Sequence, residues 1–597
     1  MKAAGLWLTV FLLTVVSLPA DDTQAAQQYV LWIRQAIDDN RWGEALAAAE
    51  RAADFSGSSS DISYLLAFIR SHERKNRQSV IEALELAIET NRWFLYNEGQ
   101  ALLLMAEQLI PMRAYSDALF LLDQLVFDQL AWAPAPPPSE NAGIASDAAM
   151  LRLLAVKGMI SNFSSAQTTA PHAFDAQFRS RVLETIDRYP RDPRPFRVFF
   201  DYINNKKLKP SVITEGDLNL LELVLKRLPF LIEADPELAW IAAPYIRDKE
   251  EAKRLAASYR SGGIPNVRIR DFKPSPGSIV IALQFGLLGD NEAVEEFFSG
   301  SRGFNYPLPA GVAPDGNPVL ERNVLTDVYA SLGSEEGRDL FTKKLLSFSG
   351  TILDDEDGDG YFDSRAVCRE GAVREIDFDF NGDNESNFRI FFTADGGPVN
   401  SEYFTIGDRS RAFIEWERYP SVSRVKMTEE IFSFRPAEFQ FAPVAFVELG
   451  GSNSHSGLAY PVPLHHNMDL SRRSLVSFCA NIQRPSAEFS GAVEQIFFRE
   501  GIPLQAVITL NGKQVSVMEF ERGRPSVQRL DIDLDGRMET VRRFNYAGSA
   551  VSSESDWTGE GIYKTGEIHL PDGSVVYSWD IDGRGMMNYT EIRSENE

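Results

Sequence analysis

The chain has 597 residues, a formal charge of −25 and a pI of about 4.8. Because a single hydrophobic core stops growing at about 250–300 residues, this length predicts two or more domains. The hydrophobic content of 44% and the charged content of 24% are typical of globular proteins and exclude a mainly disordered chain. The strong negative charge repels phosphate backbones, so we expect no nucleic acid partner.

Residues 1–20 have the pattern of a secretory signal peptide. Lys2 gives a positive start, residues 5–16 form an apolar run, and Pro19 and Ala20 supply a breaker and a small residue for cleavage. An uncleaved membrane anchor is the alternative, but the run is shorter than the about 20 residues that a span needs. We therefore expect an exported protein in the periplasm, at the cell surface or secreted, with no transmembrane span after signal removal.

Residues 21–130 show a repeated helical pattern. Three stretches align on a central alanine, at Ala45, Ala83 and Ala118, with spacings of 38 and 35 residues. A period near 34 residues with a small residue where two helices cross is typical of tetratricopeptide repeats, and the segment resembles that family in degenerate form. The resemblance implies an α-solenoid of helical hairpins that binds a protein or a peptide.

The rest of the chain divides by composition into further segments. Helical patterns continue loosely through 148–299 and 321–350, whereas proline and glycine interrupt them in between. After residue 350 the apolar pattern changes to period two, and Asn511-Gly512 between two such runs predicts a β-hairpin with a type I′ turn. The predicted segments are a Pro-rich linker at 131–147, further helical repeats at 148–299, a Gly/Pro-rich loop at 300–320, the last solenoid helices at 321–350, and an antiparallel, hairpin-rich β domain at 351–597.

Three acidic segments of the β domain share one spacing of oxygen ligands. Ligands at positions 1, 3, 5 and 9 can converge on one cation when the chain turns sharply at a glycine in position 6. Hard carboxylate oxygens favour calcium over zinc or copper. The predicted calcium ligands are Asp355, Asp357, Asp359 and Asp363 in the first loop, Asp377, Asp379, Asn381 and Glu385 in the second, and Asp531, Asp533, Asp535 and Glu539 in the third.

None of the three loops is an ordinary EF-hand. Position 12, where an EF-hand places a bidentate Glu, holds Ala366, Phe388 and Arg542. The nine-residue form resembles the loops of integrin α-chain propellers, where such a loop joins two strands. The first loop, with Cys368 five residues after Asp363, is also similar to a thrombospondin type 3 calcium repeat. A solvated acidic turn that binds nothing is the alternative for each loop.

The residues around these loops alternate between apolar and acidic. Leu530, Ile532 and Leu534 alternate with Asp531 and Asp533, which predicts apolar side chains on the core and carboxylates on the opposite face. A fourth copy is expected around Asp580 and Asp582-Gly583. In that register Ser578 and Met586 replace two ligands, so we expect the fourth copy to bind no metal.

Candidate catalytic residues are few. His455, His465 and His466 gather with Asp469 in the Gly/Ser/Pro-rich stretch 450–469, which we interpret as a surface loop and, alternatively, as an active site. The sequence contains no phosphate-binding glycine loop, zincin motif or dinucleotide fingerprint. Cys368 and Cys479 could form a disulfide in an oxidising compartment, and the sequence leaves this open.

The sequence therefore favours a non-enzymatic exported protein. Its helical repeats are expected to bind another envelope protein or a peptide, and aromatic residues such as Trp42, Trp93, Tyr96 and Tyr115 would pack in the helical core or line a groove. Its β domain is expected to be stabilised by structural calcium. The alternatives are an envelope hydrolase acting on glycan or peptide near 450–469, and a calcium-dependent surface adhesin.

Overall fold

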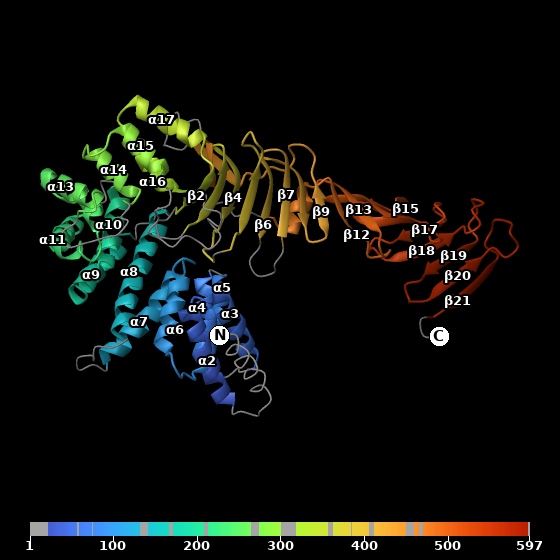
Figure 1. Cartoon of the computed structure of the whole chain (residues 1–597). Helices are drawn as coiled ribbons and strands as arrows, with labels where there is room; N and C mark the ends of the chain where they lie inside the picture. The colour runs from blue at the N-terminus through green and yellow to red at the C-terminus, as the bar shows by residue number, and fades with distance from the viewer. Residues whose placement is uncertain are drawn as a thin grey trace, which may run out of the picture. The chain divides into compact units, whose positions relative to one another are not determined.

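The structure is a computed structural model that describes most of the chain (Figure 1). The described residues are 22–55, 59–73, 76–131, 141–165, 171–207, 213–263, 274–299, 318–355, 362–383, 385–404, 411–448, 459–464 and 470–594. They confirm the predicted fold class: helices come first, and a large antiparallel β region follows. The predicted signal peptide, the whole proline run, His455, His465, His466 and Asp469, and two predicted ligands, Asp357 and Asp359, lie outside the described residues.

The chain divides into two compact units. The first contains residues 1–371, 378–386 and 448–458, and the second contains residues 372–377, 387–447 and 459–597. The change from helix to strand follows α17 (Glu335–Leu346), but the first unit extends beyond residue 350. It does so because its strand β2 (Gly350–Asp354) pairs with a strand that precedes the last two helices of the unit.

Helices of the first unit follow one another along the chain, and each of the first eight that the structure describes packs against the next. They are α2 (Asp22–Asp38), α3 (Trp42–Phe55), α4 (Ser60–His72), α5 (Arg77–Thr90), α6 (Glu98–Leu109), α7 (Tyr115–Ala131), α8 (Asn141–Ser165), α9 (Pro171–Arg188), α10 (Arg194–Lys207), α11 (Glu215–Leu231), α12 (Leu238–Ala242), the 3₁₀ turn η2 (Ala243–Tyr245), α13 (Lys249–Arg260), α14 (Gly277–Gln284), α15 (Asp290–Ser299), α16 (Arg322–Ser331) and α17 (Glu335–Leu346). None of the helices that the structure describes combines the length and the apolar composition that a membrane span requires.

The three aligned alanines occupy equivalent places in successive hairpins. Ala45, Ala83 and Ala118 lie on α3, α5 and α7, the second helices of the pairs α2–α3, α4–α5 and α6–α7, and all three are buried. A methyl side chain at these positions lets neighbouring helices approach closely. The helical repeat that the sequence predicts is therefore present in the structure.

The aromatic residues of this region take part in packing. Tyr115 is buried, and a Cβ atom added to Gly158 on α8 would come within 2.3 Å of its ring. Trp42 stacks on His72 with 3.5 Å between ring centroids, and Trp93 and Tyr96 pack against the core of the first hairpins. Core packing therefore accounts for Tyr115 and contributes at the other three positions.

Buried polar groups shape the links between helices. The fully buried carboxylate of Asp61 at the start of α4 accepts hydrogen bonds of 2.7–2.8 Å from the backbone N–H groups of Phe94, Leu95 and Tyr96. These bonds satisfy the carboxylate and fix the irregular link between α5 and α6. The carboxylate needs these hydrogen bonds because a buried charge without partners is strongly destabilising.

Two boundaries differ from the sequence prediction. Helix α8 begins at Asn141, inside the predicted linker 131–147, because the last proline of the run is Pro138 and the single glycine that follows, Gly143, is tolerated within a helix. Residues 319–321, part of them in the predicted loop 300–320, form strand β1 (Val319–Glu321). Val319 and Leu320 are buried, and β1 pairs in parallel with β2 (Gly350–Asp354).

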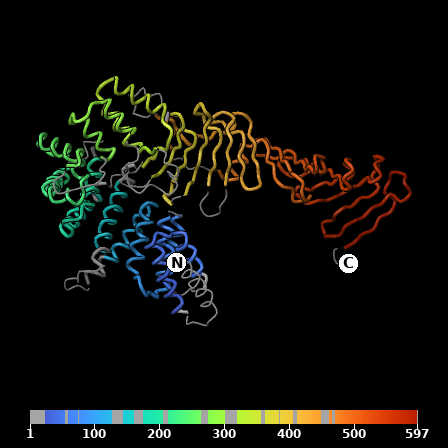
Figure 2. The backbone as a smooth tube through the Cα atoms, in the orientation of Figure 1, coloured from blue at the N-terminus to red at the C-terminus, as the bar shows by residue number. Residues whose placement is uncertain are grey.

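The strands of the second unit form a ladder in which chain neighbours pair side by side (Figures 1 and 2). Each strand from β5 to β9 pairs antiparallel with the next, β9 pairs with β12, and the same pattern continues from β12 to β21. The inserted strands β10 and β11 form a separate two-stranded sheet, and the short helix α18 (Arg472–Phe478), which the sequence did not predict, is capped by Ser471.

The strands after β2 have the following bounds: β3 (Ser364–Arg369), β4 (Ala372–Phe378), β5 (Phe388–Phe392), β6 (Pro398–Phe404), β7 (Arg411–Arg418), β8 (Ser421–Met427), β9 (Glu430–Ser433), β10 (Val444–Glu448), β11 (Ala459–Pro463), β12 (Asn481–Pro485), β13 (Val493–Arg499), β14 (Ile502–Leu510), β15 (Lys513–Glu521), β16 (Arg524–Leu530), β17 (Thr540–Phe544), β18 (Ala550–Ser555), β19 (Thr565–His569), β20 (Val575–Trp579) and β21 (Tyr589–Arg593).

Turn chemistry sets the register of this ladder. Asn511 and Gly512 have φ angles of 52° and 80°, and they join β14 to β15 with Leu510 opposite Lys513, as predicted for a type I′ hairpin. Arg522-Gly523 joins β15 to β16 with the same pair of positive φ angles.

The side chains become more exposed toward the end of the ladder, and strands β18 to β21 contain no fully buried residue. The last strands thus form a sheet that buries neither face.

Candidate metal centre

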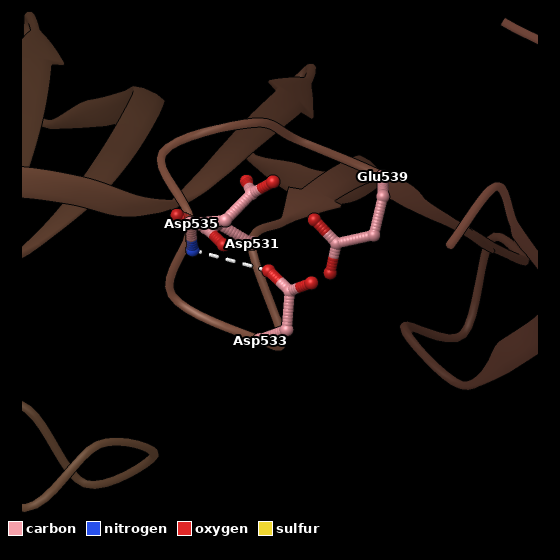
Figure 3. A group of neighbouring side chains, drawn as sticks. All are labelled: Asp531, Asp533, Asp535 and Glu539. Carbon is pink, nitrogen blue, oxygen red and sulfur yellow. Dashed lines mark hydrogen bonds between the residues drawn. The ribbon is translucent and has the colours of Figure 1, made fainter. Parts of the chain in front are cut away.

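A nine-residue loop, 531–539, joins β16 to β17 and brings four predicted ligands together. Oxygen atoms of Asp531, Asp533, Asp535 and Glu539 all lie within 4.8 Å of one another. Figure 3 shows the four side chains around the turn of the loop, with the carboxylates of Asp533 and Glu539 facing each other. Within the described part of the chain, no other group of three or more His, Cys, Asp or Glu side chains has this geometry.

One carboxylate oxygen of each ligand shapes the loop. Oδ2 of Asp531 accepts a hydrogen bond of 2.8 Å from the N–H of Gly536, and Oδ1 of Asp533 accepts one of 3.1 Å from the N–H of Asp535. Oδ1 of Asp535 accepts from the N–H of Arg537 at 2.7 Å, and Oε1 of Glu539 accepts from the N–H of Ile532. The loop therefore holds its carboxylates in place with its own backbone.

The remaining oxygens of two ligands are buried without a hydrogen-bond donor. Asp531 is fully buried, and its Oδ1 has no hydrogen-bond partner; the same is true of Oε2 of Glu539. A buried carboxylate oxygen without a donor is costly unless a cation compensates it. This donor set fits a hard divalent cation, because calcium takes six to eight oxygen ligands from carboxylates, backbone carbonyls and water.

The alternation predicted for this loop is wrong. Asp531 is fully buried, whereas Ile532 and Leu534 are 59% and 43% exposed. The reason is that β16 ends at Leu530, so the chain is no longer extended in the loop. Leu534 has a φ of +64° and Gly536 a φ of +102°, so the backbone turns twice within three residues, and the N–H of Gly536 meets Oδ2 of Asp531.

Loops of nine residues recur between other strands of the β region. They are 355–363 between β2 and β3, 379–387 between β4 and β5, 556–564 between β18 and β19, and 580–588 between β20 and β21. Their starts lie 24 or 25 residues apart within the pair 355 and 379 and within the series 531, 556 and 580. The β region thus contains an internal repeat of strand, nine-residue loop, strand and short turn.

Hydrogen bonds and backbone angles confirm that these loops are equivalent. The N–H of Asp379 donates to the carbonyl of Asp363 at 2.9 Å, linking the first residue of one loop to the ninth residue of the loop before it, and Asp556 with Glu539 and Asp580 with Lys564 repeat this bond. The fourth position has a left-handed φ of 64–69° in four of the loops. The residues at that position are Gly382, Leu534, Gly559 and Gly583.

This equivalence corrects the predicted register of the second loop by two residues. Asp377 lies inside β4, where its carboxylate pairs with Arg389 of β5 and is buried. The loop begins at Asp379, whose Oδ1 accepts from the N–H of Asp383 at 3.2 Å, and Glu385 contributes its N–H to Oδ1 of Asp383 at 2.9 Å. Positions 1, 3, 5 and 9 are therefore Asp379, Asn381, Asp383 and Asn387.

The first loop keeps its predicted register. Asp355 and Asp363 occupy positions 1 and 9, and the N–H of Asp363 donates to the carbonyl of Asp354 at 2.8 Å. The side chain of Asp363 forms an ion pair of 3.2 Å with Arg113 in the turn between α6 and α7. This ion pair ties the first loop to the helical hairpins of the same unit.

The fourth copy also has a different register from the predicted one. Asp580, Asp582, Arg584 and Asn588 stand at positions 1, 3, 5 and 9. The N–H of Gly585 donates to Oδ2 of Asp580 at 2.9 Å and that of Ile581 to Oδ1 of Asn588 at 3.0 Å, as in loop 531–539. An arginine therefore replaces one carboxylate, and the Nε of Arg584 lies 3.5 Å from Oδ2 of Asp582.

A fifth loop, 556–564, was missed by sequence reasoning. Its positions 1, 3, 5 and 9 hold Asp556, Thr558, Glu560 and Lys564. The ammonium of Lys564 lies 3.3 Å from Glu560 and 3.7 Å from Asp580, so one lysine of the protein lies beside carboxylates of this loop and of the next. The 24- to 25-residue spacing is the sequence signal that could have identified it.

Both cysteines are free thiols and buried. Burial raises the pKa of the Cys368 thiol to about 12 and that of the Cys479 thiol to about 11. Thiols with such pKa values are almost wholly protonated at neutral pH and are poor nucleophiles and metal ligands. They therefore add no donor to the candidate metal centre.

Comparisons with known proteins give only distant structural similarity. No family model matches the chain, and no curated protein matches it. One similar solved structure is pilF of Pseudomonas aeruginosa, with 13% identity over 41% of this chain and 95% of that chain and a TM-score of 0.28. A second is YrrB, a TPR protein with an unusual peptide-binding site, with 13% identity over 35% of this chain and 92% of that chain and a TM-score of 0.24. A third is Acl4, an assembly chaperone of RpL4, with 10% identity over 53% of this chain and 97% of that chain and a TM-score of 0.25. At these TM-scores the similarities assign no function to the chain.

Proposed function

We propose that the chain is an exported, non-enzymatic interaction scaffold whose β region is stabilised by calcium bound in loop 531–539. The observation that carries the calcium proposal is the fully buried Oδ1 of Asp531, which has no hydrogen-bond partner and lies among three further carboxylates. Four negative charges within 4.8 Å repel one another and need compensation. Loop 556–564 has a lysine, Lys564, at one ligand position, and loop 580–588 has an arginine, Arg584, at another. The four ligand positions of loop 531–539 hold only carboxylates.

Calcium suits this loop better than other common cations. Magnesium requires near-ideal octahedral geometry and gives up its water reluctantly, and zinc and copper favour nitrogen and sulfur ligands. Two of the carboxylates are exposed, so water can complete the coordination shell. A bound cation would fix the link between β16 and β17, and through the bond from Asp556 N–H to the carbonyl of Glu539 it would also support the start of the next loop.

Thermal unfolding of the full chain with calcium and with chelator tests this role. Loops of this kind in extracellular modules bind with a Kd of about 0.1–1 mM, so about 10 mM calcium would stabilise the β region by about 1.4–2.7 kcal/mol. The expected result is a rise of several degrees in the midpoint of the β transition, which Asp531→Asn abolishes. An identical midpoint in calcium and chelator would overturn the proposal.

Support for the scaffold role comes from the helical unit. Its hairpins stack in sequence, and large apolar side chains remain exposed on them, among them Phe94 at 50%, Phe120 at 65% and Leu86 at 50%. Repeat arrays of this kind offer extended surfaces to protein and peptide partners, and exposed apolar side chains mark interaction sites. The proposed partner is a protein or peptide segment of the cell envelope.

Site-specific photocrosslinking tests the scaffold role. A benzophenone amino acid at Phe120 on α7 should crosslink one partner in envelope extracts, whereas the same group at the exposed Glu82 on α5 should not. The same crosslinked products at both positions would count against a specific surface on α7.

Two alternatives differ in what they require. A hydrolase with its site near 450–469 would lose activity when His455 and His466 are replaced by Ala. A calcium-dependent adhesin would lose adhesion in chelator while its helical unit stays folded. The scaffold proposal requires neither a hydrolytic activity nor surface adhesion.

A further inference from the structure

A shallow depression of about 510 Å³ lies on the last three strands of the chain. Loop 556–564 contributes Trp557 and Lys564, β20 contributes Trp579, and β21 contributes Tyr589 and Glu591. Asp580, the first residue of the last nine-residue loop, also lines it. The depression therefore combines three aromatic rings with charged groups of both signs.

The aromatic rings of this depression are not used to build a core. Trp557 is 68% exposed and Tyr589 is 49% exposed, and the four strands around them have no fully buried residue. Trp579 and Tyr589 are direct cross-strand partners, with 5.6 Å between ring centroids and 45° between ring planes. Large aromatic residues left exposed on one patch of a protein surface indicate a binding site.

The loop that carries Trp557 is held rigidly by the residue before it. The carboxylate of Asp556 accepts hydrogen bonds from Thr558 Oγ1 at 3.0 Å, from the N–H of Gly559 at 3.1 Å and from the N–H of Gly561 at 2.6 Å. The backbone N–H of Asp556 donates to the carbonyl of Glu539 at 2.7 Å. Trp557 is therefore presented at low entropic cost to a ligand.

The polar groups of the depression supply both donors and acceptors. The Lys564 ammonium is oriented by Glu560 and Asp580, and the Glu591 carboxylate is 40% exposed and oriented by Arg593 at 2.9 Å. A ligand with many hydroxyl groups can donate to Glu591 and accept from Lys564. The depression thus offers hydroxyl groups both a hydrogen-bond donor and an acceptor beside its aromatic rings.

We propose that this depression, defined by Trp557, Trp579 and Tyr589, binds a neutral glycan built of hexopyranose rings. The C–H groups on one face of a pyranose ring carry a partial positive charge and pack on the negative face of an aromatic ring. The hydroxyl groups at the ring edge form hydrogen bonds with the charged side chains. The net charge of −25 disfavours polyanionic ligands such as nucleic acids or sulfated chains, so a neutral glycan is the class that fits. This site is separate from the calcium loop and does not depend on the proposed scaffold role.

Calorimetric titration of the full chain with cellohexaose, hexa-N-acetylchitohexaose and maltohexaose, all three neutral, tests the proposal, with tryptophan fluorescence as a second readout. The expected result is millimolar or tighter binding of at least one hexasaccharide, weakened about tenfold by Trp557→Ala or by Trp579→Ala. Tyr546→Ala is the matched control, because Tyr546 is 72% exposed on the same sheet but does not line the depression, and it should leave binding unchanged.

Three results would overturn the proposal. They are no binding of any of the three glycans at millimolar concentration, binding that both tryptophan variants leave unchanged, and equal weakening by Tyr546→Ala. Because Trp557 lies in an exposed loop, Trp557→Ala is expected to fold even if Trp579→Ala does not. Circular dichroism of both variants separates a loss of binding from a loss of folding.

Discussion

The main-chain carbonyl oxygen of Pro111 lies 1.8 Å from the point that a Cβ atom on Gly382 would occupy. Gly382 belongs to the nine-residue loop 379–387, and Pro111 lies in the turn between α6 and α7 of the same unit. The N–H of Arg77, at the start of α5, donates to the carbonyl of the neighbouring Asp383 at 2.8 Å. The loop is therefore packed directly against the helical hairpins. Its glycine is required by this contact and is favoured by its φ of +64°, an angle that Leu534 also adopts at the equivalent position of loop 531–539.

Replacing this glycine should loosen the contact between loop and helices. Gly382→Ala meets both a strained left-handed backbone and the Pro111 carbonyl, so we expect a loss of more than about 2 kcal/mol of stability. Gly396→Ala is the matched control, because Gly396 has a φ of +81° but nothing within 4 Å of its Cβ position. Denaturant unfolding measures both, and equal losses would show that the Pro111 contact contributes nothing.

The loop 580–588 should become a cation site when its missing ligands are restored. Arg584→Asp with Asn588→Glu gives this loop the carboxylate set of loop 531–539, on a backbone that already forms the same hydrogen bonds. We expect one additional bound calcium per chain, weakened by the Lys564 ammonium 3.7 Å from Asp580. Calorimetric stoichiometry measures this, and an unchanged number of sites would contradict the equivalence of the two loops.

Glu107 on α6 should make the helical unit less stable as pH rises. Burial, and secondarily the charge of Asp147, raises the pKa of Glu107 from 4.5 to about 7. The folded state therefore holds this proton more tightly than the unfolded state, so stability falls as pH rises from about 4.5 to 7 and stays reduced above that range. Glu107→Gln should add up to about 3 kcal/mol at pH 8 and little at pH 4.

Denaturant unfolding of the helical unit at a series of pH values checks this dependence. Glu82→Gln on the exposed face of α5 is the control, and it should leave the pH dependence of the wild type unchanged. A Glu107→Gln variant with the same slope between pH 4.5 and pH 7 as the wild type would contradict the assignment.

Much of the fold follows from local sequence patterns. Helical periodicity with Ala45, Ala83 and Ala118 predicts the stacked hairpins because the small residue and the crossing point coincide. Asn511-Gly512 predicts its hairpin because few residues accept two positive φ angles in succession. Strand β1 was not predictable, because its three residues are stabilised by β2, about 30 residues later in the chain.

The ligands of a loop were predictable only where the first aspartate of the acidic pattern directly follows the last residue of a strand. In loop 531–539 the first aspartate follows the last strand residue, and the predicted ligands converge. In the second loop Asp377 satisfies the acidic spacing. It lies inside β4, however, and forms an ion pair with Arg389 on β5, so the loop begins two residues later. Loop 556–564 lacks the acidic pattern because Thr558 and Lys564 replace ligands, and only its length and repeat spacing reveal it.

The most direct test of the calcium proposal is calorimetric titration of calcium into the full chain and into two variants matched by loop position. Asp531→Asn removes the buried carboxylate of loop 531–539, and Asp580→Asn removes the equivalent residue of loop 580–588. We predict that the wild type binds calcium, that Asp531→Asn loses one site, and that Asp580→Asn retains every site. Unchanged binding in Asp531→Asn, or no calcium binding by the wild type, would contradict the account.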